Sequence, residues 1–489
     1  AQAPPATAGE NQPMIAMSVY GESGNSNVTA TDGWFVTRDG SHVLVFGDGG
    51  SSDYFPAMSA MASSGKVFLS RVKFLAEAGS RVEAIGEGNI DHLAVFGLTA
   101  IAGSSRLEAR DCGFFASASS LKLRTNGPDC HDHALLGIVG DDADITVADV
   151  TFAATQQTNL TLEALGADSL NVALLGAVQS RAASSDATIR GAHFFLRDST
   201  AAVTVGEDAG GVGLLALVAF GDSNTVDIYA TNVSFDVSNA TVVLAVQQAG
   251  DDPHYTMAVA GFAAAKRGRL QLDDFMTLSA VDSVIAVTMP GPDQSIAVGG
   301  LVAHDTSAEI GVDTGSVTRL YFRNVTTVVN LTSPSSAVAA VQGIGVAAAG
   351  NADVEVNGLV RIAVVASSTT LQSASTDRDV VCGALIREGD LEIGNAGNVS
   401  IDGCRSVFHA HGNRLGNLTL NASGGVVNAG RFVASVGTPS SPAYSRCMAD
   451  FPPPELPPLN VPVFRLAPRA RPTTPSRTLS RSRTVHASR

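Results

Sequence analysis

The chain has 489 residues, of which 45 % are hydrophobic and only 6 % aromatic, with 49 glycines and one tryptophan, Trp34. This length suits either about three ordinary domains or one long repeat array, and the scarcity of large rings favours a narrow interior filled by Ala, Val, Leu and Ile. The net charge of −15 argues against nucleic acid as a partner, because phosphate binding requires a basic surface.

No apolar run reaches the roughly eighteen residues that a membrane-spanning helix requires, and the longest candidate, Val212 to Phe220, is about half that length. We therefore predict no transmembrane segment within these residues. The chain starts Ala1-Gln2-Ala3 without an initiator methionine. We interpret this start as that of a chain processed after a signal peptide or of an internal fragment.

Residues 1–50 are irregular and contain stretches rich in Gly and Ser. We predict an N-terminal cap here, since the open edge of a repeat array otherwise invites aggregation. From residue 51 to about 435, three short boxes recur in fixed order. The first is a run of small apolar residues whose last residue falls at positions 97, 137, 176, 216, 261, 300, 343 and 383, a period of 39 to 45 residues. Such a period predicts an array of stacked units.

The second box alternates apolar and polar residues and often ends on phenylalanine, as in Leu107 to Phe114 and Leu270 to Phe275. The third is a shorter alternation, such as Leu160-Thr161-Leu162. Alternation with a period of two predicts β-strands with one buried face. The pattern leaves open whether one repeat makes one coil or two.

A unit of this size buries too few apolar side chains to offset the entropy of ordering it, so neighbouring units must stack. We predict an all-β fold, a parallel right-handed β-helix (β-solenoid) of roughly 40-residue repeats. A β-propeller is the alternative, but the recurring aromatic or Trp-Asp signatures of propeller blades are missing from the sequence. From Val436 the composition shifts to Pro, Ser, Thr and Arg, so residues 436–489 are predicted to be a largely disordered linker.

Asn-X-Ser/Thr triplets, the acceptors of N-linked glycans in secreted proteins, predict a glycoprotein. Four of them share the form Asn-Leu/Ala-Thr near the third box, at Asn159, Asn239, Asn330 and Asn417, so we expect a shared edge that carries glycans. Alternatively, asparagine suits a recurring tight turn in which amides stack between coils, and both can hold together. The nine candidate sites are Asn27, Asn159, Asn232, Asn239, Asn324, Asn330, Asn398, Asn417 and Asn421.

Five cysteines are present, and two pairs of them lie 18 and 22 residues apart. A chain that returns to the adjacent layer about 4.8 Å away could close such pairs, so we predict the disulfides Cys112–Cys130 and Cys382–Cys404. Buried free thiols are the alternative. Cys447 is left over and suggests an intermolecular bridge or a partner outside this chain. No Cys-X-X-Cys pair occurs, so a metal site is not predicted.

The clusters of titratable residues carry little evidence for chemistry. The segment from Asp129 to His133 contains metal-ligand types, but we expect a solvated turn there, and His409-Ala410-His411 has no companion aspartates. The carboxylate pairs Asp141-Asp142, Asp251-Asp252 and Asp273-Asp274 lack the motifs that accompany such pairs in β-helix enzymes. We therefore predict no catalytic, cofactor-binding or metal site, and no enzyme.

The repeating Ile/Val-X-Val-X-Asp/Gly…Phe box, with Ala-Leu-Leu-Gly between its copies, resembles pectin-lyase-like right-handed β-helices. Together with the tail from Pro475 to Thr484, it also looks like the large, predicted membrane-associated surface proteins of free-living kinetoplastid protists. This resemblance implies a solenoid ectodomain followed by Ser/Thr-rich stalks and a membrane segment. No such segment occurs among these residues, so anchoring would use a region absent from this chain.

The expected function is that of a non-catalytic extracellular or cell-surface β-solenoid ectodomain with a structural, adhesive or display role. Its partner would be an unidentified surface ligand, carbohydrate or protein. The alternative is a polysaccharide lyase or glycoside hydrolase of the β-helix type, which needs Asp with His or Arg converging in an exposed lateral cleft. A third hypothesis, binding to ice or mineral, needs long flat threonine ladders.

Overall fold

The computed structural model is all-β: the part of the chain that it describes forms strands and turns and no helix. The described residues are 15–22, 26–48, 54–87, 92–102, 105–127, 131–166, 170–180, 186–206, 211–247, 255–289, 294–304, 307–331, 341–349, 351–373, 380–387, 390–393, 396–402, 407–411, 421–422 and 426–429.

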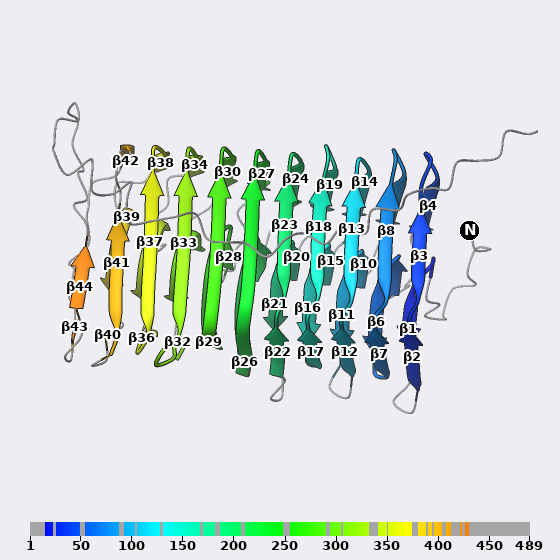
Figure 1. Cartoon of the computed structure of the whole chain (residues 1–489), viewed down its shortest axis with the longest axis horizontal. Helices are drawn as coiled ribbons and strands as arrows, with labels where there is room; N and C mark the ends of the chain where they lie inside the picture. The colour runs from blue at the N-terminus through cyan, green and yellow to red at the C-terminus, as the bar shows by residue number, and fades with distance from the viewer. Residues whose placement is uncertain are drawn as a thin grey trace, which may run out of the picture. The chain divides into compact units, whose positions relative to one another are not determined.

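Each repeat forms one coil, and the strands of successive coils lie side by side (Figure 1). The second coil consists of β5 (Tyr54–Ala57), β6 (Ala60–Ser63), β7 (Lys66–Ser70), β8 (Lys73–Glu77) and β9 (Arg81–Glu87). Every strand pairs in parallel with its equivalent in the next coil, so that Leu121 lies between Val82 and Leu160. The fold is therefore the predicted parallel β-solenoid, with one coil per repeat.

The last strand of each coil joins a ten-stranded parallel sheet, and we number the coils 1 to 10 by these strands. They are β4 (His42–Asp48), β9, β14 (Ser120–Thr125), β19 (Asn159–Ala164), β24 (Thr200–Val205), β27 (Thr241–Val246), β30 (Val284–Met289), β34 (Thr326–Leu331), β38 (Ser368–Ser373) and β42 (Val407–His411).

From coil 6 onward, strands that are separate in earlier coils fuse into long ones. The remaining strands, outside the ten-stranded sheet, form a larger sheet around the other sides of the coils. They are β1 (Val19–Gly21), β2 (Asn27–Thr31), β3 (Trp34–Thr37), β5 to β8, β10 (His92–Val95), β11 (Leu98–Ile101), β12 (Arg106–Arg110), β13 (Gly113–Ser117), β15 (His131–Leu135), β16 (Ile138–Asp141), β17 (Asp144–Ala148), β18 (Thr151–Thr155), β20 (Leu170–Leu174), β21 (Ala177–Ser180), β22 (Asp186–Arg190), β23 (His193–Arg197), β25 (Val212–Leu214), β26 (Ala216–Ser238), β28 (Tyr255–Ala258), β29 (Gly261–Val281), β31 (Gln294–His304), β32 (Glu309–Val312), β33 (Val317–Arg323), β35 (Val341–Ala349), β36 (Asp353–Val356), β37 (Leu359–Val365), β39 (Val380–Arg387), β40 (Asp390–Ile393), β41 (Asn398–Asp402), β43 (Asn421–Ala422) and β44 (Val426–Ala429).

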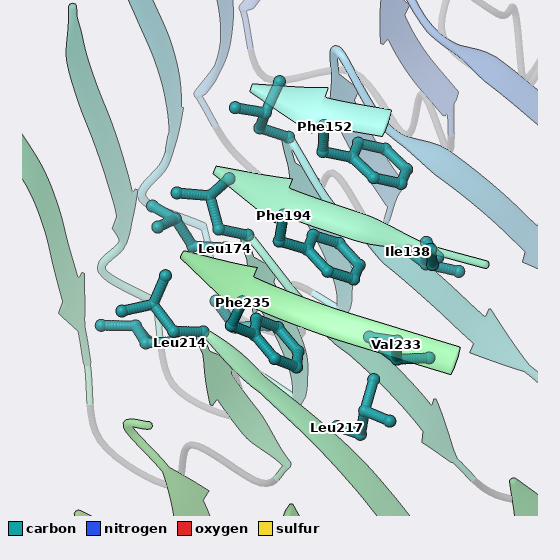
Figure 2. Close-up of a cluster of buried hydrophobic side chains, with 14 of the residues drawn as sticks. Ile138, Phe152, Leu174, Phe194, Leu214, Leu217, Val233 and Phe235 are labelled. Atoms are coloured by element: carbon teal, nitrogen blue, oxygen red, sulfur yellow. The ribbon is translucent and has the colours of Figure 1, made fainter. Parts of the chain in front are cut away.

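A column of stacked phenylalanine rings runs through the interior of coils 1 to 6. Consecutive ring centroids lie 4.7–5.0 Å apart and the rings are within 9° of parallel, and Figure 2 shows three of them beside buried leucines of the facing strands. Equivalent residues of successive coils stack directly on one another. The side chain in one coil therefore determines which side chains fit at the same position in the next coil. The six rings are Phe35, Phe74, Phe114, Phe152, Phe194 and Phe235.

The ends of the first sequence box form a sharp corner where backbones of adjacent coils approach closely. A Cβ atom on Gly176 would lie 2.3 Å from the carbonyl oxygen of Ala216, and one on Gly300 would lie 1.8 Å from that of Gly345. The residue before the corner is often bulky and left-handed, as at Phe96 (φ 53°) and Leu136 (φ 51°). At Gly176 and Gly300 glycine is therefore favoured by the small space between coils rather than by its own torsion angles, whereas coil 6 has Ala216 at this position.

Three details of the sequence interpretation are corrected by strand register. The predicted irregular cap at residues 1–50 is wrong for its described part, because β1 to β4 pair in parallel with β6 to β9 and form four of the five strands of a first coil. Phe275 is 56 % exposed, because it lies in a β-bulge where Asp274 and Phe275 together face Asn232, and Leu278 instead lies beneath Phe235. The corner of coil 9 is Gly345, not residue 343, because Gly345 pairs with Gly300.

The apolar alternation in the sequence did not identify the first coil, because this coil is at the end of the array and is less buried. In β2 the inward residues Val28 and Ala30 are only partly buried. At the other end, β44 finishes at Ala429. The linker expected at residues 436–489 lies outside the described residues.

We predict that Phe152→Ala lowers the free energy of unfolding by about 3–5 kcal/mol, because it opens a cavity in the middle of the ring column. Phe152→Leu should lose less, since Leu278 continues the same column in coil 7. Phe275→Ala is the matched control and should stay within about 0.5 kcal/mol of the parent. Urea denaturation measures all three, and equal losses for Phe152→Ala and Phe275→Ala would contradict the register.

We also predict that Gly300→Ala destabilises the chain by about 1–3 kcal/mol through overpacking against the backbone of coil 9. Gly33→Ala is its control, because a Cβ there meets only ordinary contacts at 3.8 Å or more. Thermal unfolding of the two variants should separate them. A stable Gly300→Ala protein would show that the corner has room for a side chain.

Candidate functional site

The outer face of the ten-stranded sheet changes character along the array. Near its N-terminal end it carries charged side chains, such as Lys122, which pairs with Glu163 at 3.0 Å, and Glu83, which is 3.1 Å from Nε2 of His42. From β24 to β34 the outward residues are uncharged and exposed or half-buried. We call this surface the neutral face, and its residues are Thr200, Ala202, Thr204, Thr241, Val243, Ala245, Val284, Ala286, Thr288, Thr326, Val328 and Asn330.

Register turns the intermittent threonines of the sequence into a partial ladder. Thr200 pairs with Thr241, but the next residue in this row is Val284, and Thr326 follows it. The hydroxyl row is thus interrupted in coil 7. This interruption does not favour the hypothesis of ice or mineral binding, which needs an unbroken ladder.

One rim of the neutral face is a row of turns that we call the polar edge, formed by Gln156, Gln157, Asp198, Asn239, Asp282 and Asn324. These residues have left-handed backbones, with φ between 49° and 63°, a conformation that Asn and Asp tolerate well. The Nδ2 of Asn239 donates to Oδ1 of Asp198 at 2.7 Å, and the Nδ2 of Asn324 donates to Oδ1 of Asp282 at 2.7 Å. Asparagine therefore occupies the recurring tight turn, but its contact between coils is amide on carboxylate and not the amide-on-amide stacking expected from the sequence.

A shallow groove of about 620 Å³ crosses the polar edge in coils 4 to 6. Amide, hydroxyl and carboxylate side chains line it. They belong to Gln156, Gln157, Thr158, Asp198, Ser199, Thr200, Asn239 and Thr241.

The structure sorts the predicted glycosylation sites by exposure. Asn27, Asn159, Asn232, Asn239 and Asn324 are exposed, whereas Asn330 and Asn398 are half-buried. Of the four expected on one edge, Asn159 and Asn239 lie at or beside the polar edge, but Asn330 lies within β34. Asn324, which was not among those four, occupies the edge instead. Asn417 lies outside the described residues, and for Asn421 only the backbone position in β43 is described.

A ladder of buried polar residues occupies one register position of coils 2 to 5. The rings of Tyr54 and His92 stack at 5.2 Å, Nδ1 of His92 lies 2.9 Å from Oδ2 of Asp132, and Nδ2 of Asn171 donates to Oδ1 of Asp132 at 2.7 Å. Asp132 is 0 % exposed. The solvated turn expected around residues 129–133 is therefore wrong from His131 onward, because these residues form strand β15.

Asp132 remains acidic in this buried position. Burial by itself would raise the pKa of Asp132, but the hydrogen bonds from His92 and Asn171, with the charges of His92 and His131, hold that pKa below its usual value. The ladder therefore joins three coils by charge-assisted hydrogen bonds.

His133 points to the opposite side of the same strand, into the core. It stacks between Leu93 and Val172, is 0 % exposed, and neither ring nitrogen has a hydrogen-bond partner among the described residues. Burial lowers the pKa of His133 to about 3, against the opposing attraction of Asp132. The imidazole is thus neutral and acts as a core side chain.

Only one predicted disulfide cysteine has a described side chain. Cys112 is a buried free thiol that donates to the carbonyl oxygen of Arg110 at 3.1 Å, and burial raises the pKa of its thiol. Cys130, Cys404 and Cys447 lie outside the described residues, and of Cys382 only the position in β39 is described. The pairings Cys112–Cys130 and Cys382–Cys404 stay predictions.

Carboxylates also gather in a column that no sequence motif indicates. Asp144, Asp186 and Asp227 stack at the starts of β17, β22 and a segment of β26, with Arg106 before them and Arg269 after them. Burial and the charges of Asp227 and Asp144 raise the pKa of Asp186. The column arises only from register, because its members lie about forty residues apart.

The predicted carboxylate pairs do not join this column. Asp141 ends β16, with Asp142 directly after it, and Asp273-Asp274 lies within β29; Asp251-Asp252 lies outside the described residues. His409 and His411 fall in β42. Among described side chains, no group of three or more His, Cys, Asp or Glu is placed to hold a metal ion.

The comparisons with known proteins give no relatives: no protein-family model matches the chain, and no curated protein matches its sequence. In the part of the chain that the structure describes, no helix is long and apolar enough to cross a membrane.

We predict that His133 makes the fold sensitive to acid. Its pKa is about 3 in the folded chain and about 6.5 when unfolded, so the unfolded state binds an extra proton as pH falls below about 6.5. Stability should then fall by about 2 kcal/mol between pH 7 and pH 5. His133→Leu, which matches Leu93 above it, should remove this dependence when urea midpoints are followed against pH.

The control is a comparison of the parent and the His133→Leu variant at pH 8, where His133 of the parent is neutral in both the folded and the unfolded chain. An unchanged pH slope in His133→Leu would contradict the assignment and would leave the Asp132 ladder as the acid-sensitive element.

Proposed function

We propose that this chain is a non-catalytic extracellular or cell-surface ectodomain with an adhesive, structural or display role. The observation that carries this proposal is the neutral face. Charged side chains make up roughly a quarter to a third of the surface residues of a soluble protein, yet the outward positions of β24, β27, β30 and β34 carry none, and the strands hold these positions at a regular spacing of about 4.8 Å.

The chemistry of the neutral face selects a class of partner. Threonine hydroxyls donate and accept hydrogen bonds, while Val243, Val284 and Val328 supply apolar area between them. A charged polymer would lose water on this face without gaining an ion pair. We therefore favour a neutral, hydroxyl-rich ligand such as an uncharged polysaccharide.

Two observations support an extracellular setting. The acceptor asparagines Asn27, Asn159, Asn232, Asn239 and Asn324 are exposed, so glycans attached there would not disturb the core. The five cysteines also suit an oxidising compartment if the predicted pairs form.

The alternative remains a β-helix lyase or glycoside hydrolase. The column of Asp144, Asp186 and Asp227 beside Arg106 and Arg269 is the observation that favours it, since stacked strands bring these carboxylates to about 5 Å spacing. The column does not line the groove at the polar edge. A direct assay has to separate the two functions.

We predict that the secreted chain binds insoluble neutral polysaccharide, with cellulose and chitin as probes, and releases no sugar. Val243→Lys with Val328→Lys should weaken binding about tenfold, because each lysine brings a hydrated charge into the contact. Tyr229→Lys, exposed on the larger sheet, is the control and should bind normally.

Depletion assays measure binding, and reducing-end assays on the same probes and on polygalacturonate measure cleavage. Release of reducing ends that Asp186→Asn abolishes would establish the alternative. Equal binding by the double lysine variant would remove the neutral face from the interaction.

A further inference from the structure

We infer that N-linked glycans occupy Asn239 and Asn324 in the turns of the polar edge, and Asn159 beside it at the first position of β19, which pairs with Thr200; together they place one glycan on every second coil from coil 4 to coil 8. This inference rests on the proposed function, because the modification requires passage through the secretory pathway. The inference also distinguishes these exposed sites from the half-buried acceptor asparagines Asn330 and Asn398, which we expect to be unmodified.

The spacing of the row follows from sheet topology. Asn159 begins β19 in coil 4, Asn239 precedes β27 in coil 6, and Asn324 precedes β34 in coil 8. In the ten-stranded sheet, β24 separates the first two and β30 separates the last two. With strands about 4.8 Å apart, successive acceptors lie about 10 Å apart along the array.

The coils between them cannot carry a glycan at the same turn. Asp198 stands in coil 5 and Asp282 in coil 7, at positions equivalent to Asn239 and Asn324. A glycan is bulky, and two on adjacent coils would compete for the same space. Alternation of Asn with Asp therefore gives each glycan two coils of room.

The groove supplies room on the protein side. It opens beside Asn239 and next to Asn159, and polar groups line it. The first sugar residues would thus meet hydroxyl and amide groups rather than an apolar wall. Thr200 already donates its hydroxyl to Oδ1 of Asn159 at 2.8 Å, which leaves the Nδ2 of Asn159 available for the linkage.

Glycan attachment is compatible with the turn hydrogen bonds. The reaction joins Nδ2 to the anomeric carbon of a lipid-linked oligosaccharide diphosphate; the bond from that carbon to the diphosphate breaks, and the amide nitrogen loses one proton. The second N–H of Asn239 or Asn324 remains. It can keep the hydrogen bond to Asp198 or Asp282.

Two other acceptors differ in surroundings. Asn330 is the last but one residue of β34, between Thr288 and Gln372 on the neutral face, where a glycan would cover part of that face. Asn398 lies between Leu359 and Val426, and its side-chain oxygen is buried. We expect both to be unmodified in folded, secreted protein.

The test is occupancy mapping of the full chain secreted from a glycosylating eukaryotic host, by enzymatic deglycosylation in heavy-oxygen water and peptide mass spectrometry. We expect Asn159, Asn239 and Asn324 each to be occupied in most molecules, and Asn330 and Asn398 in few. Asn→Gln at each edge site should remove one glycan by gel mobility.

The outcomes separate the row from the proposed function. Occupancy at Asn27 or Asn232 with an empty edge overturns the row and keeps the extracellular setting. A secreted chain without any glycan overturns both. High occupancy at Asn330 or Asn398 overturns the selection by burial.

A second variant tests the spacing directly. Asp198→Asn creates an acceptor triplet with Ser199 and Thr200 on the coil next to Asn239. In folded, secreted molecules we expect a glycan at position 198 or at 239 but not at both, as intact mass reports. Molecules that carry both glycans would overturn the argument that the row needs alternate coils.

Discussion

Parallel stacking of each coil on the last, at the spacing of β-strands, is the constraint on which the rest of this molecule depends. Every residue has its own equivalents directly above and below it, about 4.8 Å away. A column is therefore stable only if its residue type tolerates itself as a neighbour. Phenylalanine does, because flat rings stack at this distance, as between Phe114 and Phe152 at 4.9 Å.

The same constraint explains positions that would be unfavourable in isolation. At the corner, Phe96 and Leu136 accept left-handed torsion angles, although such angles cost about 1–2 kcal/mol for residues with a Cβ. They gain complete burial in return, and the glycine that follows each of them admits the next coil. The torsional strain of one residue at the corner thus allows buried contacts that many residues of adjacent coils share.

Like charges are the residues that stacking tolerates least. Burial, together with the charges of Asp227 and Asp144 in the same column, raises the pKa of Asp186, whereas the polar edge avoids such repulsion by alternating Asp with Asn. Asn239 and Asn324 each donate to the carboxylate of the preceding coil. The alternation of Asp with Asn is therefore electrostatically favourable even without glycans. The same alternation suits both the stacking of the turns and the proposed glycosylation.

The period, the strand boxes and the solenoid could be predicted because apolar alternation repeats in every interior coil. What could not be predicted depends on register between residues about forty positions apart. Asp132 and His133 read as a polar turn, yet one points into a ladder with His92 and the other into the core. Phe275 fits the box but lies at a register shift, three residues before Leu278, which takes the place of the ring beneath Phe235; this shift is visible only from the partner strand.

Since the interior columns are nearly uniform, whatever distinguishes this protein from another solenoid has to lie in its outward residues. The neutral face and the polar edge meet at Thr241 and Thr326, which are outward residues of the sheet and also complete the acceptor triplets of Asn239 and Asn324. In the proposed arrangement a row of glycans borders the contact face along this rim. A partner would then reach the face from its open side, so the modification would select among partners, while the first sugars would contact only Thr200 and Thr241 at the rim of that face.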